Sequence, residues 1–157
     1  MENSNIENPT SELNDFELIK DFEKHKAEFR IDTFELTEHS ADGGELKVYH
    51  NKNFDYVVFD FWLYGETGRL NYTYWTEKGG DNNFKFIKQL DYDYDKPYYK
   101  EGYKTDSIIR YLSYSSSSYR LFDINKKEIV ESEQVEKTKT DLEFFFKDVI
   151  EDVEFLK

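Results

Sequence analysis

The feature that most constrains this chain is a series of short β-rich runs separated by turn clusters. The runs cover residues 31–37, 45–50, 55–64, 69–77, 84–94, 107–114, 119–124 and 128–131. The gaps hold clusters that favour turns, such as Gly65-Glu66-Thr67-Gly68. Parallel neighbours need a crossover of about a dozen or more residues, and these gaps are shorter. The pattern therefore predicts an antiparallel β-meander of about seven or eight strands, which can be strongly curved.

Each end of the chain shows a helical pattern beside this sheet. Thr10 or Ser11 can cap a helix that extends to about Ala27, with apolar residues at Leu13, Phe16, Leu18, Ile19 and Phe22. Thr140 and Glu143 have the spacing of a capping box for a second helix. Its apolar stripe consists of Leu142, Phe145, Phe146, Val149, Ile150, Val153 and Leu156. We expect an α+β fold with the N-terminal and C-terminal helices packed on one face of the sheet.

The length of the chain indicates a single domain. A chain of 157 residues is long enough to bury a sizeable core but too short for two independent domains. Residues 1–9 are polar, so we expect a disordered leader followed by one domain over residues 10–157. The sequence has no signal-peptide pattern and no apolar run of the about 18–20 residues that a membrane helix needs. We therefore expect no membrane span.

The acidic charge and the composition exclude several classes of site. The formal net charge is −13, with 34 acidic against 21 basic residues. Nucleic acid is therefore not an expected partner, because phosphate binding draws on an excess of lysine and arginine. The absence of cysteine excludes disulfides and thiolate zinc sites. The glycines match no nucleotide-binding pattern and no catalytic motif is assembled, so we expect no cofactor and no enzymatic activity.

Aromatic residues supply much of the apolar surface. Phe, Tyr and Trp make up 18% of the chain, and each buried ring removes roughly 150–250 Å² from water. Strict alternation would place Phe84 and Phe86 on one side of their strand. Tyr and Trp on a one-layer sheet can either bridge core and solvent or form a shallow platform that binds protein or sugar. The candidate platform residues are Tyr56, Trp62, Tyr64, Tyr72, Tyr74 and Trp75.

An acidic repeat, DYDYD, occupies residues 91–95. Its first positions match an EF-hand loop, but Lys96 and Gly102 stand where that loop needs glycine and glutamate. On a strand, the three acids of the repeat would share one face. These acids are Asp91, Asp93 and Asp95. Their repulsion can be relieved by a weakly bound calcium ion or by water and nearby lysines.

A set of turns and aromatic residues also carries a family resemblance. The set consists of Tyr64-Gly65-Glu66-Thr67-Gly68, Tyr72-Thr73-Tyr74-Trp75, Phe84-Lys85-Phe86, Tyr92-Asp93-Tyr94, Lys96-Pro97-Tyr98 and a closing hairpin over residues 119–129. It resembles an uncharacterised family of Bacteroidetes-type lipoproteins and secreted proteins. The resemblance implies export from the cytoplasm and no established activity, so it supplies no catalytic residues.

These observations predict a non-enzymatic binding or structural module of the cell envelope or exterior. It would bind a protein or a glycan through the aromatic sheet face. The resemblance implies a periplasmic or cell-surface location, lipid-anchored if the native start carries a lipobox, with a cytoplasmic location as the alternative. The alternative function is an acidic inhibitor or immunity-type protein that caps a basic toxin or enzyme, because the charge of −13 would speed association with a basic partner. The sequence does not indicate an oligomeric state.

Overall fold

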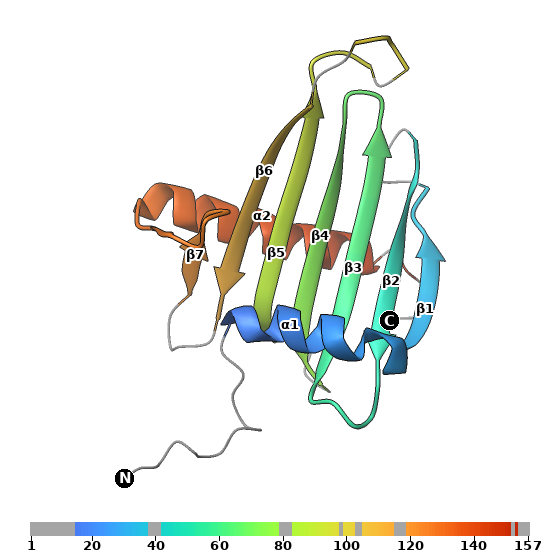
Figure 1. Cartoon of the computed structure of the whole chain (residues 1–157), viewed down its shortest axis with the longest axis vertical. Helices are drawn as coiled ribbons and strands as arrows, with labels where there is room; N and C mark the ends of the chain where they lie inside the picture. The colour runs from blue at the N-terminus through green and yellow to red at the C-terminus, as the bar shows by residue number, and fades with distance from the viewer. Residues whose placement is uncertain are drawn as a thin grey trace.

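The fold is an eight-stranded antiparallel sheet with two helices (Figure 1). The computed structural model describes residues 15–37, 42–78, 83–97, 99–102, 105–114, 119–151 and 153. The helices are α1 (Asp15–His25), a short 3-10 turn η2 (Lys26–Glu28) and α2 (Ser132–Glu151). The strands are β1 (Arg30–Glu35), β2 (Gly44–His50), β3 (Tyr56–Gly65), β4 (Gly68–Glu77), β5 (Phe84–Tyr94), β6 (Thr105–Ser113), β7 (Arg120–Phe122) and β8 (Glu128–Ile129).

Every strand pairs with its neighbours in sequence. The order across the sheet is β1 to β8, all pairs are antiparallel, and the sheet is open rather than closed into a barrel. The predicted antiparallel meander is therefore confirmed. The longest pairing joins β3 and β4 from Tyr56 opposite Glu77 to Gly65 opposite Gly68. The two glycines flank the two-residue turn that the sequence indicates at this point.

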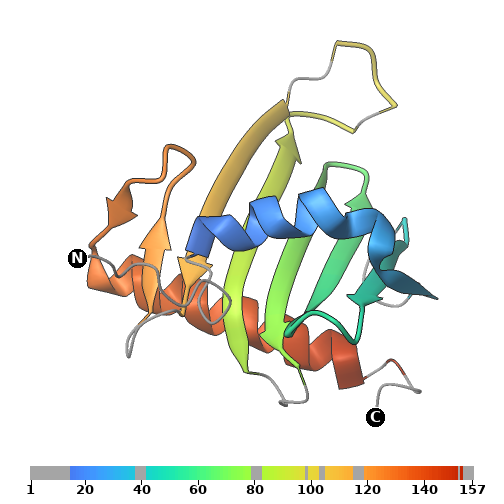
Figure 2. The same cartoon turned by 60° about the horizontal axis from the view of Figure 1, so that its bottom comes forward.

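The two helices cover opposite faces of the sheet, as Figure 2 shows from a second angle. The core on the α2 side includes Leu46, Phe61, Tyr74, Ile87, Leu112, Leu142, Phe146 and Val149. The core on the α1 side includes Leu18, Phe22, Tyr49, Tyr56, Val58, Trp75 and Phe86. The expectation that both helices pack on one face is wrong. Alternate residues of β3 are apolar on both sides, so each face of the sheet needs its own cover.

A β-bulge in β5 changes which aromatic rings share a face. Trp75 pairs with Phe86 and Thr76 pairs with Phe84, so Lys85 is an extra residue in β5. As a result, Phe84 packs against the α2 core and Phe86 lies in the α1 core. The expectation that both rings line one side is wrong, because strict alternation does not account for an inserted residue.

Helix α2 begins about two turns before the capping box that the sequence suggested at Thr140. It begins at Ser132. The negative charge of Glu133 in the first turn stabilises the helix, because it lies at the positive end of the helix dipole. Thr138 is buried on the same helix, so the inward-facing side begins before Leu142. At the other end, α1 is described from Asp15 onward, and the expected leader over residues 1–9 lies outside the described residues. Neither described helix combines the length and the apolar character needed to cross a membrane.

Tyrosine hydroxyl groups connect both helices to the sheet. The hydroxyl of Tyr56 donates to Oδ2 of Asp21 in α1 at 2.7 Å. The hydroxyl of Tyr74 donates to the carbonyl oxygen of Leu142 in α2 at 2.7 Å. Two further bonds to α2 join Tyr114 to Glu143 and Tyr119 to Glu136. Burial raises the pKa of Tyr56 and Tyr74, so these rings stay protonated and keep donating at neutral pH.

Candidate functional site

Half of the predicted platform residues lie in the core. Tyr56 and Trp75 are buried under α1, and Tyr74 is buried under α2. Their exposed fractions are 1%, 2% and 0%. These rings therefore have no surface to present to a ligand, and they stabilise the two helices instead.

Tyr72 lies on the α2 side of the sheet. Its ring is half-buried, with its centroid 4.9 Å from that of Phe145, and its hydroxyl donates to Oδ1 of Asp91 at 2.9 Å. Trp62 and Tyr64 lie on the opposite side, because they continue the alternation of Tyr56 and Val58 along β3. The structure therefore does not bring the predicted platform residues together on one face.

One end of the sheet extends beyond both helices as a single layer, which we call the bare end. It comprises residues 62–65 of β3, 68–71 of β4, 90–94 of β5 and 105–109 of β6. In Figure 1 both helices cross the sheet away from the end at which the β3–β4 turn lies. Neither described helix crosses the tip of the bare end, whereas Leu63, Asn71 and Leu90 at its inner margin are buried.

An aromatic patch lies on the α1 side of the bare end and consists of Trp62, Tyr64, Arg69 and Tyr92. The rings of Trp62 and Tyr64 are stacked, with centroids 6.0 Å apart and planes inclined by 10°. The guanidinium carbon of Arg69 lies 4.4 Å from the ring centroid of Tyr92 and 5.8 Å from that of Trp62. These cation–π contacts hold the long side chain of Arg69, on β4, against rings of the two neighbouring strands, β3 and β5. The patch is thus ordered while still accessible, since Tyr64 is 39% exposed.

Arg69 and Tyr92 belong to this patch but are not among the residues that the sequence predicted for it. A signal for them does exist in the Gly65–Gly68 turn, because a two-residue turn fixes the register of its hairpin. That register places Arg69 opposite Tyr64. The next pairing, of Arg69 with Tyr92, depends on the bulge in β5 and could not be read from spacing alone.

A buried polar cluster lies beside the aromatic patch on the same face. Oδ1 of Asp60 accepts hydrogen bonds from Nδ2 of Asn71 at 2.7 Å and from Oγ1 of Thr73 at 3.0 Å. Burial raises the pKa of Asp60, although these bonds and the charges of Lys26 and Lys47 act in the opposite direction. Nδ2 of Asn71 also donates to the carbonyl oxygen of Phe61 at 3.0 Å. The cluster fixes the strands under the patch rather than presenting a free group to solvent.

The acidic repeat lies on β5 and just beyond its end. Oδ1 and Oδ2 of Asp91 accept hydrogen bonds at 2.9 Å from Tyr72 and Gln89 on the α2 side. Burial raises the pKa of Asp91, and the charge of Asp93 adds to this effect. The described part of the chain contains no group of three or more histidine, aspartate or glutamate side chains that could hold a metal ion. Asp91, Asp93 and Asp95 are not among any such group, and the calcium site that the sequence suggested stays a prediction.

A shallow, open hollow of about 330 Å³ lies at the β3–β4 turn. Its lining comprises Leu63, Tyr64, Gly65, Thr67, Gly68, Arg69, Leu70, Asp91, Tyr92 and Asp93. Gly68 allows β4 to lie close to β5 here, because a Cβ atom at this position would lie only 2.6 Å from the carbonyl oxygen of Tyr92 and 3.5 Å from Oδ1 of Asp93. The lining of the hollow includes residues of the aromatic patch as well as Asp91 and Asp93 of the acidic repeat.

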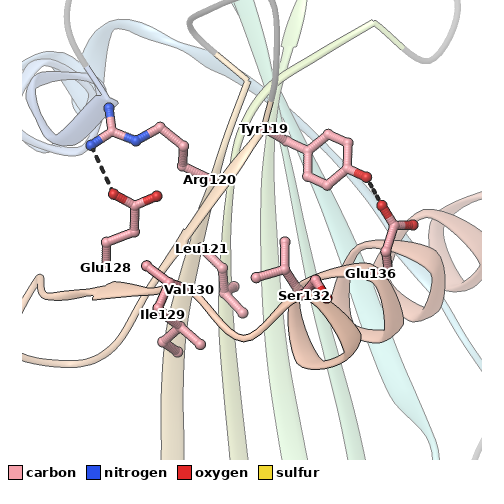
Figure 3. Close-up of a pocket in the computed structure, with 9 residues that line it drawn as sticks. Tyr119, Arg120, Leu121, Glu128, Ile129, Val130, Ser132 and Glu136 are labelled. Atoms are coloured by element: carbon pink, nitrogen blue, oxygen red, sulfur yellow. Dashed lines mark hydrogen bonds and ion pairs between the residues drawn. The ribbon is translucent and has the colours of Figure 1, made fainter.

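A second hollow, of about 250 Å³, lies between the β7–β8 hairpin and the start of α2 (Figure 3). Nη2 of Arg120 contacts Oε1 of Glu128 at 3.3 Å. The hydroxyl of Tyr119 donates to Glu136 across the opening. These four charged or polar groups pair with one another within the lining, so the bare end is the stronger candidate for binding.

Comparisons with protein-family models, with curated proteins and with solved structures give no match. Any function proposed for this chain therefore comes from its own surface.

Proposed function

We propose that this protein is a non-enzymatic binding module that holds a partner protein through the bare end of its sheet. The aromatic patch is the anchor of this contact. The observation that supports the proposal is the ordered stack of Trp62 and Tyr64 beside Arg69 on an uncovered sheet face. Trp, Tyr and Arg are the residue types that most often dominate the binding energy of protein interfaces.

The order of the patch favours binding for a physical reason. A side chain that is already held in place loses little conformational entropy when a partner arrives. Stacking restrains Trp62 and Tyr64, and the contacts of Arg69 with Trp62 and Tyr92 restrain its long side chain. A contact made by these four side chains therefore keeps more of its interaction energy as affinity.

The placement of the two buried carboxyl groups supports a binding role over catalysis. Among the described carboxyl groups, the pKa is raised at Asp60 and Asp91. Acid–base pairs must converge on one substrate. Asp60 faces the α1 side, in line with Val58, whereas Asp91 bonds Tyr72 on the α2 side. The backbone of the sheet separates them, so these two groups do not form such a pair.

The test replaces the patch and compares it with exposed aromatic residues elsewhere. A photo-crosslinking amino acid at Tyr64 should capture a partner from cells that express the protein, whereas the same group at Phe144, which is 66% exposed on α2, should not. With the captured partner purified, Trp62→Ala together with Tyr64→Ala should weaken binding by roughly 30-fold or more. Phe144→Ala should change it by about twofold at most.

Two outcomes would contradict the proposal. Equal crosslinking from positions 64 and 144 would mean that the patch is not the contact. Retention of a glycan, rather than a protein, by the wild-type chain but not by the Trp62/Tyr64 variant would place the patch in sugar binding instead. Circular dichroism and thermal unfolding of each variant show whether the fold is intact.

A further inference from the structure

We propose that the partner presents a basic segment, whose lysine or arginine side chains dock on the α2 side of the bare end. This inference rests on the proposed function, since it names the chemistry of the partner that the bare end holds. It adds a second face of the same sheet end to the contact.

The α2 side of the bare end is acidic and lacks a described helix above it. Asp93 pairs directly opposite Asp106 in the β5–β6 register, and Asp91 lies two residues before Asp93 on the same face. Like charges directly opposite one another in a sheet are destabilising. Within the described ranges, neither Asp93 nor Asp106 makes an ion pair or a side-chain hydrogen bond. A cationic side chain from outside would relieve this repulsion.

The surroundings of these acids fit long basic side chains. Leu63 and Leu70 line the hollow beside Asp91 and Asp93, and Ile108, opposite Asp91 in the register, is 43% exposed. Lysine and arginine bury their aliphatic stems along apolar surface while the charged head stays in a polar environment.

The charge of the whole chain acts in the same direction. With a net charge of −13, the protein attracts basic partners over distances beyond direct contact. Charge complementarity of this kind mainly raises the rate of association and makes it sensitive to salt. A basic segment would therefore be steered to the molecule and then fixed by Asp93 and Asp106.

The experiment uses peptides as probes and the full-length chain. One labelled peptide of about twelve residues alternates lysine with leucine and serine, which gives an extended segment with a regular spacing of charges. A second peptide has glutamate in place of each lysine. Binding is measured by fluorescence anisotropy at about 50 mM salt and again at about 500 mM, where exposed charges are strongly screened.

Two double variants with the same loss of charge are compared. Asp93→Asn with Asp106→Asn removes the paired acids of the bare end, and Glu133→Gln with Asp148→Asn removes two exposed acids of α2. The lysine peptide should bind the wild type, lose affinity at high salt and bind the Asp93/Asp106 variant roughly tenfold more weakly. The α2 variant should bind within about twofold of the wild type, and the glutamate peptide should bind none of them.

Two results would overturn the inference. Equal weakening in both double variants would show attraction to the overall charge, and a lysine peptide that does not bind the wild type would show that no basic contact exists. A Trp62→Ala, Tyr64→Ala variant separates the two proposals. Loss in that variant with full binding by the Asp93/Asp106 variant would keep the aromatic anchor and reject the basic contact. The reverse pattern would support the basic contact, and the crosslinking and binding tests at Trp62 and Tyr64 then decide the anchor.

Discussion

Two phenylalanines on α2 provide a matched test of how this helix docks. Phe146 is 4% exposed, and Phe144 on the same helix is 66% exposed. The ring of Phe146 lies 4.9–5.0 Å, centroid to centroid, from the rings of Tyr74, Phe59 and Phe84. Phe146→Ala should therefore lower the free energy of unfolding by about 3–5 kcal/mol, because it removes buried surface and leaves a cavity. Phe144→Ala should change it by about 0.5 kcal/mol at most.

Urea unfolding followed by tryptophan fluorescence measures both variants. With a denaturant dependence of about 2 kcal/mol per molar, Phe146→Ala should lower the midpoint by roughly 1.5–2.5 M. Both changes put alanine in the same helix, so the difference in helix propensity cancels between them. Phe146→Leu, which should cost about 1 kcal/mol, provides a reading if the alanine variant does not fold. Equal effects at the two positions, or a larger effect at Phe144, would refute the docking of α2 through this face.

Three further changes test the polar contacts of the core. Tyr74→Phe should cost about 1 kcal/mol in chemical unfolding, because it removes the bond to the Leu142 carbonyl while the ring stays in place; no change would mean that this bond does not form. Asp60→Asn should raise the free energy of unfolding at pH 7 and leave it nearly unchanged below pH about 4. Burial raises the pKa of Asp60, so the charged carboxylate destabilises the folded state, and this penalty is absent once the group is protonated. The pKa of Tyr56 is raised by burial, so its contribution is complete below pH about 10 and is lost as the pH rises further, by up to about 1.4 kcal/mol per pH unit. The pH dependence of unfolding above pH 10 should therefore be less steep in Tyr56→Phe, and an unchanged slope would exclude a buried Tyr56.

The meander could be predicted because its information is local. Turn residues such as Gly65 and Gly68 mark the ends of strands, and gaps of a few residues leave antiparallel pairing as the available topology. The register of the β3–β4 hairpin follows from the same turn. Local chemistry thus determines the order and direction of the strands without any knowledge of the tertiary packing.

The placement of the helices and the burial of the tyrosines depend on long-range packing, which spacing does not reveal. The phenol of Tyr74 is compatible with a surface as well as with a core, and the carbonyl that accepts its hydrogen bond is far along the chain, at Leu142. In the same way, Tyr56 is buried because α1 brings Asp21 to its hydroxyl. Trp62 and Tyr64 lie on the same strand without such a cover. Tyrosine and tryptophan side chains are therefore buried where a helix crosses the sheet and lie at the surface where none does.

The division of the interior by the sheet has a consequence for motion. The rings under α1 and those under α2 belong to separate clusters with a layer of backbone between them. The described part of helix α1 has 11 residues, fewer than an isolated helix needs to be stable in water. Detachment of α1 would therefore expose Tyr49 and Trp75 while the core under α2 keeps its own cover. Amide hydrogens of α1 would then exchange with solvent well before those of β3 and β4.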